Sequence, residues 1–220
     1  MMVPSSDAGI EIYVRNKRPA DMTSFRPERT VLYVHGATYP ASTAFDLQLD
    51  GMSWMDYIAS RGYDVYLLDL RGYGKSTRPK EMSDKPEANA PLVRGETAVK
   101  DISSVVDFIL KRRNISKVNL LGWSWGTTLM ATYTTQNAAK VERLVLYAPL
   151  YAMREAPPIS GIGAYRAVSR EPARQRGVRG IPADRLAVVP NAVDNIPPLD
   201  ADRGAGRQIR AQLGLGDKFV

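Results

Sequence analysis

A serine between two glycines is the residue of this sequence best placed to do chemistry. It lies in the run Gly122-Trp123-Ser124-Trp125-Gly126. A serine on a tight strand-to-helix turn adopts a strained backbone that lifts its hydroxyl clear of the sheet, and the residues two positions away on either side must be small. Gly122 and Gly126 supply that space. The pattern predicts that Ser124 is a nucleophile and that the Trp125 N–H, at the start of a helix, faces a developing oxyanion.

The residues on either side of this run favour that interpretation over a chance match. Val118 to Leu121 is a short apolar run typical of a buried strand, and Thr127 to Gln136 has a helical composition. A strand before the serine and a helix after it are what such a motif requires. We therefore expect Ser124 to lie on the turn between the two elements.

A second motif, His35-Gly36-Ala37, follows the apolar run Val31 to Val34. Glycine lets the backbone turn there, so the Ala37 N–H can point into the crevice at the carboxyl ends of the strands, where open α/β sheets bind ligands. Ala37 is thus the candidate for a second oxyanion donor. His35 is either a general base or a hydrogen-bonded residue that supports the loop. We favour support, because a histidine directly before the turn is placed to hold backbone.

A third motif invites a phosphate-binding interpretation, and its spacing argues against one. It reads Asp69-Leu70-Arg71-Gly72-Tyr73-Gly74-Lys75-Ser76. A Walker loop needs glycine at the position of Asp69. A dinucleotide-binding loop needs glycine at Thr77 and then a helix, which Pro79 disfavours. We expect Asp69 and Arg71 to form a structural pair that orders this loop.

The elements that must position these motifs alternate between short β-rich runs and helical patterns. This alternation predicts an α/β fold with a mainly parallel sheet flanked by helices. Residues 81–91 are polar and twice interrupted by proline, which is typical of a loop. The expected strands are 10–14 at an edge of the sheet, 31–34, 65–68, 118–121 and 144–147, and the expected helices are 53–61, 97–113 and 127–136.

Composition excludes several classes of protein and of site. The 220 residues are 44% hydrophobic, enough for a core, and no stretch approaches the roughly 20 apolar residues of a membrane-spanning helix. The first nine residues have no signal-peptide pattern, so we expect a cytoplasmic protein. With no cysteine and one histidine, disulfides, thiol nucleophiles, Cys-ligated zinc and multi-histidine metal sites are excluded. We expect no metal and no cofactor.

The last part of the chain differs in composition from the rest. Of the 18 aromatic residues only Phe219 follows Tyr165, and residues 166–220 are rich in Arg, Ala, Gly and Pro. Such a segment has little with which to fill a core. Its prolines interrupt any basic helical stripe, so we do not expect nucleic-acid binding. We predict a core over residues 1–150 and a lid-like or irregular tail, poorly structured and possibly out of frame, over residues 151–220.

Taken in order, the three motifs resemble those of the α/β-hydrolase superfamily, in its esterase and lipase-like branch. The resemblance covers Ile10 to Tyr151. It implies that Ser124 is the nucleophile, that the N–H groups of Ala37 and Trp125 form the oxyanion hole, and that the substrate is a small carboxylic ester or related acyl compound. Hydrolysis would proceed through an acyl-serine. The family also requires an acid and, last in the chain, a histidine, each after a further strand.

The sequence departs from the family pattern after Ser124, where no histidine follows. Four aspartates are available by type, but none follows a convincing strand, and none is assigned as the acid: Asp184, Asp194, Asp200 and Asp202. Without imidazole a serine is a weak nucleophile at neutral pH, so we expect weak or no turnover. The pattern suggests a truncated or frame-shifted hydrolase with the break between Tyr165 and Ile181. A native lid or arm is the alternative, and it leaves the absent base unexplained.

Two other functions stay open. The chain is alternatively a non-catalytic pseudoenzyme that binds a small ligand, or an enzyme in which His35 serves as base. Trp123 and Trp125 flank the serine and weakly favour apolar acyl groups, whereas we expect Trp54 to pack in the core. Lys75 and Arg78 would favour an anionic substrate, although solvated loop charges are commoner. No feature predicts a membrane partner or an oligomeric state.

Overall fold

The computed structural model describes residues 1–49, 51–149 and 163–165 of the chain. The predicted tail at residues 151–220 therefore lies outside the described residues, apart from residues 163–165. The predicted break after Tyr165 lies outside them as well. Both stay predictions.

The described residues form a six-stranded sheet in the order β1-β2-β4-β3-β5-β6. The four strands from β4 to β6 in this order are parallel to one another, whereas β1 and β2 pair antiparallel, so the predicted mainly parallel sheet is confirmed. The strands are β1 Met2–Pro4, β2 Glu11–Lys17, β3 Thr30–Val34, β4 Asp64–Leu68, β5 Val118–Trp123 and β6 Val141–Tyr147.

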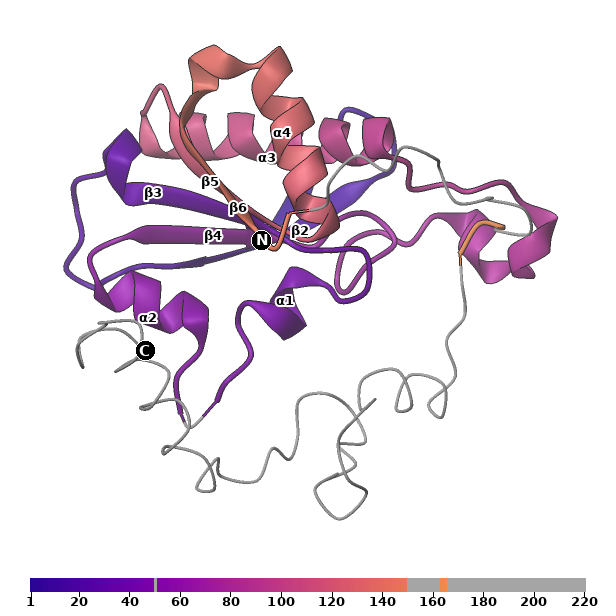
Figure 1. Ribbon diagram of the computed structural model, residues 1–220, viewed down its shortest axis with the longest axis horizontal. Helices are drawn as coiled ribbons and strands as arrows, with labels where there is room; N and C mark the ends of the chain where they lie inside the picture. The colour runs from indigo at the N-terminus through magenta and orange to yellow at the C-terminus, as the bar shows by residue number, and fades with distance from the viewer. Residues whose placement is uncertain (50, 150–162, 166–220) are drawn as a thin grey trace, which may run out of the picture. The chain divides into compact units, whose positions relative to one another are not determined.

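Helices cover both faces of this sheet (Figure 1). The longer helices α3 (Gly95–Arg113) and α4 (Trp125–Gln136) lie on one side, and α1 (Ala41–Ala44) and α2 (Trp54–Ser60) lie on the other. All five residues of β3 are buried, and they alternate between the two faces: Leu32 and Val34 pack in the core under α3 and α4, and Val31 and Tyr33 pack in the other. This period of two is what a central strand with helices on both sides requires.

The helices predicted at residues 53–61, 97–113 and 127–136 are present, each within three residues of the expected bounds. Local signals explain this agreement. Ser53 caps α2 by accepting from the Asp56 N–H, and the Asp56 carboxylate accepts from the Ser53 N–H in return. Gly62 follows α2 with φ +81°, a backbone conformation that glycine adopts without strain.

The expectation that residues 10–14 form an edge strand is wrong. The corresponding strand β2 lies between β1 and β4, and β1 is the edge. Strand β1 has three residues, of which only Val3 is buried, and such a short segment has no periodicity for a sequence pattern to reveal. The expected loop at residues 81–91 holds only two short 3₁₀ turns, Lys80–Ser83 and Pro86–Ala88.

A buried ion pair ties the loop after β4 to helix α3. The Arg71 guanidinium contacts both oxygens of Asp101, with Nη2–Oδ1 at 2.6 Å and Nε–Oδ2 at 2.9 Å, and its Nη1 lies 2.7 Å from Asp7 Oδ2. The Asp101 side chain is fully buried. The expected pair of Asp69 with Arg71 is therefore wrong, because the acid that Arg71 binds is brought by a helix 30 residues further along the chain.

Asp69 instead ties the loop after β4 to helix α1 and to itself through hydrogen bonds from neutral groups. Its carboxylate accepts from the Ser42 N–H at 2.9 Å, from the Ser42 Oγ at 2.8 Å and from the Lys75 N–H at 3.1 Å. A Cβ at Gly74 would overlap this carboxylate, and Gly74 also has φ +48°. The glycine of the motif is therefore explained by close packing rather than by a phosphate.

In the part of the chain that the structure describes, no helix is both long enough and apolar enough to cross a membrane.

We predict that Asp101→Asn lowers the free energy of unfolding by about 3 kcal/mol, because it leaves a buried guanidinium paired only with the partly exposed Asp7. Urea unfolding followed by circular dichroism measures this loss. Asp107→Asn on the same helix is the matched control: its pair with Lys140 is exposed and contributes about 1 kcal/mol or less. Equal losses for the two variants would contradict the importance of the buried pair.

Candidate active site

Ser124 occupies the turn between β5 and α4 with a backbone that non-glycine residues rarely adopt. Its φ is +53° and its ψ is −120°. The strand ends at Trp123 and the helix begins at Trp125, so one residue makes the whole connection. The turn is held from both sides: the Ser124 N–H donates to the Tyr147 carbonyl at 3.0 Å, and the Ser124 carbonyl accepts from the Thr127 N–H at 2.9 Å. Such strain persists only where the surroundings determine it, as at functional sites.

The two glycines of the run are required by backbone that lies against them. A Cβ at Gly122 would overlap the Gly126 carbonyl. A Cβ at Gly126 would overlap the Val34 carbonyl oxygen and would come within 2.7 Å of the His35 carbonyl oxygen. The start of α4 is thus packed directly on the end of β3, with no side chain between them.

Gly36 brings the loop after β3 against the serine itself. A Cβ at Gly36 would lie 3.0 Å from Ser124 Cβ and 3.4 Å from Ser124 Oγ. Gly36 is buried, whereas Ala37 is exposed and Ser124 is partly exposed. The serine side chain therefore lies beside the start of this loop, at a surface that solvent reaches.

His35 is fully buried, and both of its ring nitrogens are hydrogen-bonded to backbone. The Leu70 N–H lies 3.0 Å from Nε2, and because an N–H can only donate, Nε2 is the acceptor. The proton is then on Nδ1, which donates to the Gly36 carbonyl at 2.6 Å. Burial lowers the pKa of His35, partly opposed by the bond to Gly36 and by the charge of Asp69. The ring is held neutral between two loops.

The hydrogen bond from His35 sets the direction of the Ala37 N–H. In a trans peptide the carbonyl and the N–H point in opposite directions. The Gly36 carbonyl points to the buried imidazole, so the N–H of the same peptide, which belongs to Ala37, points away from it. Tyr73 holds the next peptide by donating from Oη to the Ala37 carbonyl at 2.9 Å. Among the described residues, nothing accepts a hydrogen bond from the N–H of Ala37 or of Trp125.

The structure brings together all seven residues that the sequence singled out for the site, at the carboxyl ends of β3 and β5. They are His35, Gly36, Ala37, Gly122, Ser124, Trp125 and Gly126. Sequence reasoning did not single out Tyr73, whose ring also lies 4.8 Å from that of His35. It belongs to the third motif, but no pattern in the chain shows which carbonyl its hydroxyl reaches.

Trp54, which we expected in the core, is 42% exposed. It lies at the margin of an aromatic cluster, with edge contacts to Phe45 at 5.2 Å and to Tyr147 at 5.6 Å. The expectation is wrong because spacing along a helix shows which residues share a face but does not show how much of that face the rest of the fold covers. Trp123 and Trp125 are half-buried and pack against opposite cores.

No cluster of three or more His, Cys, Asp or Glu side chains that could hold a metal ion occurs within residues 1–49, 51–149 and 163–165.

A sequence profile described as the alpha/beta hydrolase fold matches residues 29–166, which include all three motifs. The chain belongs to the α/β-hydrolase family. This membership confirms the resemblance drawn from the motifs.

Curated relatives of this family member are similar to it over part of their length. Abhydrolase domain-containing protein abhd-5.2 from Caenorhabditis elegans is 33% identical over 85 residues, which are 39% of this chain and 17% of that protein. Lipase member N from Homo sapiens is 31% identical over 121 residues, which are 54% of this chain and 30% of that protein. The chain thus spans less than a third of either relative.

Solved structures share the fold of this chain. The epoxide hydrolase VrEH1 from Vigna radiata superposes with a TM-score of 0.50 over 70% of this chain and 41% of its own, at 21% sequence identity. At this identity the likeness concerns the fold alone.

We predict that Gly126→Ala lowers the free energy of unfolding by about 3 kcal/mol or more, because its methyl group would overlap backbone that cannot rotate away. Gly95→Ala is the matched control, since the nearest atom to its Cβ would be a Leu129 methyl carbon at 3.9 Å. Alanine there should be neutral or stabilising by up to about 1 kcal/mol. Urea unfolding of both variants measures the difference, and comparable stability would contradict the packing described.

We also predict that the protein loses stability as the pH falls below about 6.5, because His35 is protonated more readily in the unfolded chain than in the folded one. The loss should reach up to about 1.4 kcal/mol per pH unit between pH 6.5 and pH 5, above the range in which carboxylates dominate. Since His35 is the only histidine, no other imidazole contributes.

Urea unfolding across this pH range tests the prediction, with His35→Asn as the variant that lacks the titrating group. The slope should be absent in the variant. If His35→Asn does not fold, the ring proton resonances of His35 in the wild-type protein provide the measurement. They should not shift until the pH is well below 6.5, and an ordinary titration would contradict the prediction.

Proposed function

We propose that this chain carries the nucleophile and oxyanion hole of a serine hydrolase that cleaves carboxylic esters or related acyl compounds. The observation that carries the proposal is the position of Ser124, on a turn with φ +53° and with Gly36 against its side chain. The relative named as a lipase supports an ester substrate.

The proposed reaction begins with attack of Ser124 Oγ on the carbonyl carbon of the ester. As the carbonyl oxygen becomes an oxyanion, the N–H groups of Ala37 and Trp125 donate to it, and Trp125 adds the positive end of the α4 dipole. Collapse of the tetrahedral intermediate expels the alcohol and leaves an acyl group on Ser124. Water then attacks this acyl-serine and releases the acid.

Both proton transfers in this scheme need a base, and the chain offers no free imidazole. Its one histidine has both ring nitrogens bonded to backbone. Loss of a triad member typically reduces turnover about 10⁴-fold, with the remainder supplied by the oxyanion hole and by binding. We therefore propose acylation that is slow and that needs an ester with a good leaving group, with release of the acid slower still.

The hydrogen bonds that occupy both ring nitrogens of His35 also favour a second candidate function. This candidate is a pseudoenzyme that binds the same ligand and uses Ser124 only as a hydrogen-bonding group. The proposal that His35 is the base is weaker, because freeing either ring nitrogen would break a hydrogen bond that holds a loop.

We predict that incubation with p-nitrophenyl acetate adds one acetyl group to the wild-type protein, at Ser124, and that Ser124→Ala removes this addition. Intact-mass spectrometry followed by peptide mapping measures it. Ser60→Ala is the control for non-specific acylation, since Ser60 is an exposed serine on α2. Acetylation that is unchanged in Ser124→Ala, or ligand binding without any acetylation, would contradict the catalytic proposal, and the latter would support the pseudoenzyme. Loss of acetylation in a folded His35→Asn variant would restore His35 as the base.

A further inference from the structure

A cavity of about 470 Å³ opens beside the loop that carries the proposed oxyanion donor. Ala37 and Thr38 contribute one side of it, next to Tyr73. Apolar side chains, among them Met82 and Val93, line it further on. A volume of this order accommodates a small organic ligand. Ala37 borders the cavity, and Gly36 directly before it lies against Ser124, so the loop from Gly36 to Ala37 connects the cavity to the reacting group. Ser124 itself is not among the lining residues.

The short segment of residues 163–165 forms another wall of the cavity and is held there by hydrogen bonds. The Ala164 N–H donates to the Pro86 carbonyl at 2.8 Å, and Tyr165 Oη donates to the Asp84 carbonyl at 3.0 Å. Only glycine fits at residue 163, since a Cβ there would overlap the Pro86 carbonyl. This wall is therefore fitted closely to the loop beneath it.

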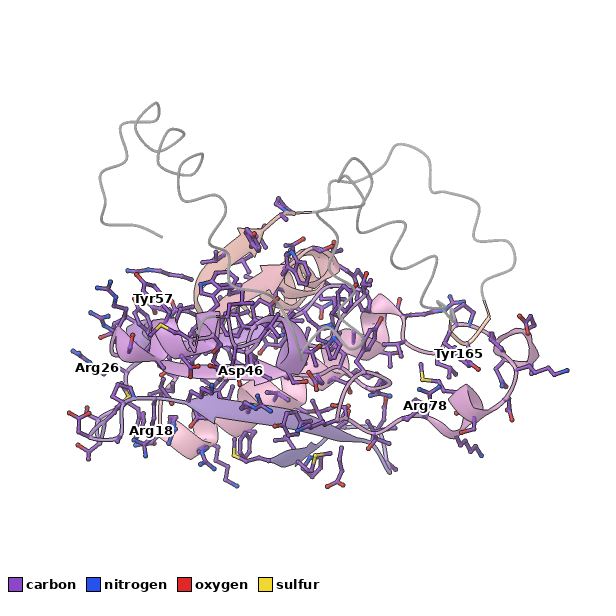
Figure 2. The ribbon with its side chains drawn as sticks, turned by 90° about the horizontal axis from the view of Figure 1, so that it is seen from below. Arg18, Arg26, Asp46, Tyr57, Arg78 and Tyr165 are labelled. Atoms are coloured by element: carbon purple, nitrogen blue, oxygen red, sulfur yellow. The ribbon has the colours of Figure 1, made fainter. Side chains whose placement is uncertain are left out.

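Arg78 is the one charged side chain that lines this cavity among the described residues. Its guanidinium carbon lies 5.5 Å from the centre of the Tyr165 ring, and its Nη2 donates to the Met82 carbonyl at 2.9 Å (Figure 2). These two contacts orient the group. Four of its five N–H bonds remain available to a ligand.

No carboxylate among the described residues lies within ion-pair distance of Arg78, and the cavity lining contains neither Asp nor Glu. Other arginines of the chain do have acids: Arg71 binds Asp101, and Arg113 binds Asp64. A guanidinium that has no acid partner among the described residues, at a cavity whose lining is mostly apolar, has the chemistry to bind a carboxylate through a pair of hydrogen bonds.

We propose that this cavity binds the apolar body of an ester that carries a second, free carboxylate, and that Arg78 is the residue that selects for this anion. The inference rests on the proposed function in taking Ser124 as the reacting group. The recognition itself requires only the cavity and Arg78. A half-ester of an aliphatic dicarboxylic acid is the simplest compound with both features.

Binding to the full chain carrying Ser124→Ala tests the recognition separately from the reaction. The probes are monomethyl adipate and methyl hexanoate, which have the same chain length and differ in the terminal carboxylate, and titration calorimetry or chemical-shift perturbation measures their affinities. We expect the half-ester to bind about fivefold more tightly than the neutral ester. Raising the ionic strength to about 0.5 M should reduce this preference.

Substitutions at Arg78 show whether the preference has the proposed origin. Arg78→Gln should remove it, and Arg78→Lys should retain part of it. Arg112→Gln is the matched control, because Arg112 is also an exposed arginine over an aromatic ring, that of Phe108 on α3. Equal affinities for the two esters, or equal effects of Arg78→Gln and Arg112→Gln, would overturn the proposal.

The outcome also separates this inference from the proposed function. If the Ser124→Ala protein prefers the half-ester but the wild-type protein is not acylated by mono-p-nitrophenyl adipate, the recognition stands and the catalytic proposal fails. If the wild-type protein is acylated equally fast by p-nitrophenyl hexanoate and by mono-p-nitrophenyl adipate, the catalytic proposal stands and the role of Arg78 fails.

Discussion

The site depends on a contact between two stretches of backbone, the start of α4 and the end of β3. Gly126 lies so close to the carbonyls of Val34 and His35 that no side chain fits between them. The parallel register that pairs Val34 with Gly122 brings both strands to an end at the same level of the sheet. Together these constraints leave one position for the residue that joins β5 to α4, and that residue is Ser124. The unusual backbone of the serine is thus a consequence of how closely a helix and a strand approach each other.

Two loops hold each other in place at this end of the sheet. The imidazole of His35, at the start of the loop after β3, accepts a hydrogen bond from the Leu70 N–H in the loop after β4. In the other direction, the Tyr73 hydroxyl of the loop after β4 donates to the Ala37 carbonyl of the loop after β3. The loop after β4 is itself anchored to α3 by Arg71 and Asp101. The hydrogen bonds of His35 and Tyr73 each bind a backbone N–H or carbonyl, so they hold the orientation of peptide planes. A preorganised oxyanion hole requires this, because donors that are already aimed need not reorganise during the reaction.

Local features of the sequence predicted most of what positions the site. The run around Ser124, the apolar strands before it and before His35, and the cap at Ser53 are each readable within a few residues, and each is present. What could not be predicted depends on contacts across the fold. Arg71 finds its acid on a helix distant in sequence, and the partner of Tyr73 is a carbonyl, which no residue type reveals. The charge of Arg78 was visible in the sequence, but its place beside Tyr165 and the absence of an acid near it among residues 1–49, 51–149 and 163–165 depend on the fold.

The orientation of two N–H groups toward an oxygen on Ser124 is most directly tested by a crystal structure of the protein treated with an alkyl phosphonate ester that carries a good leaving group. Phosphonylation would place a tetrahedral centre on Ser124 Oγ. Its non-bridging oxygen should lie within hydrogen-bond distance, about 2.7 to 3.1 Å, of the backbone nitrogens of both Ala37 and Trp125, with the His35 ring still bonded to Gly36 and Leu70. An adduct whose oxygen points away from these nitrogens, or a serine that turns out to be enclosed and unmodified while other residues react, would contradict the site described.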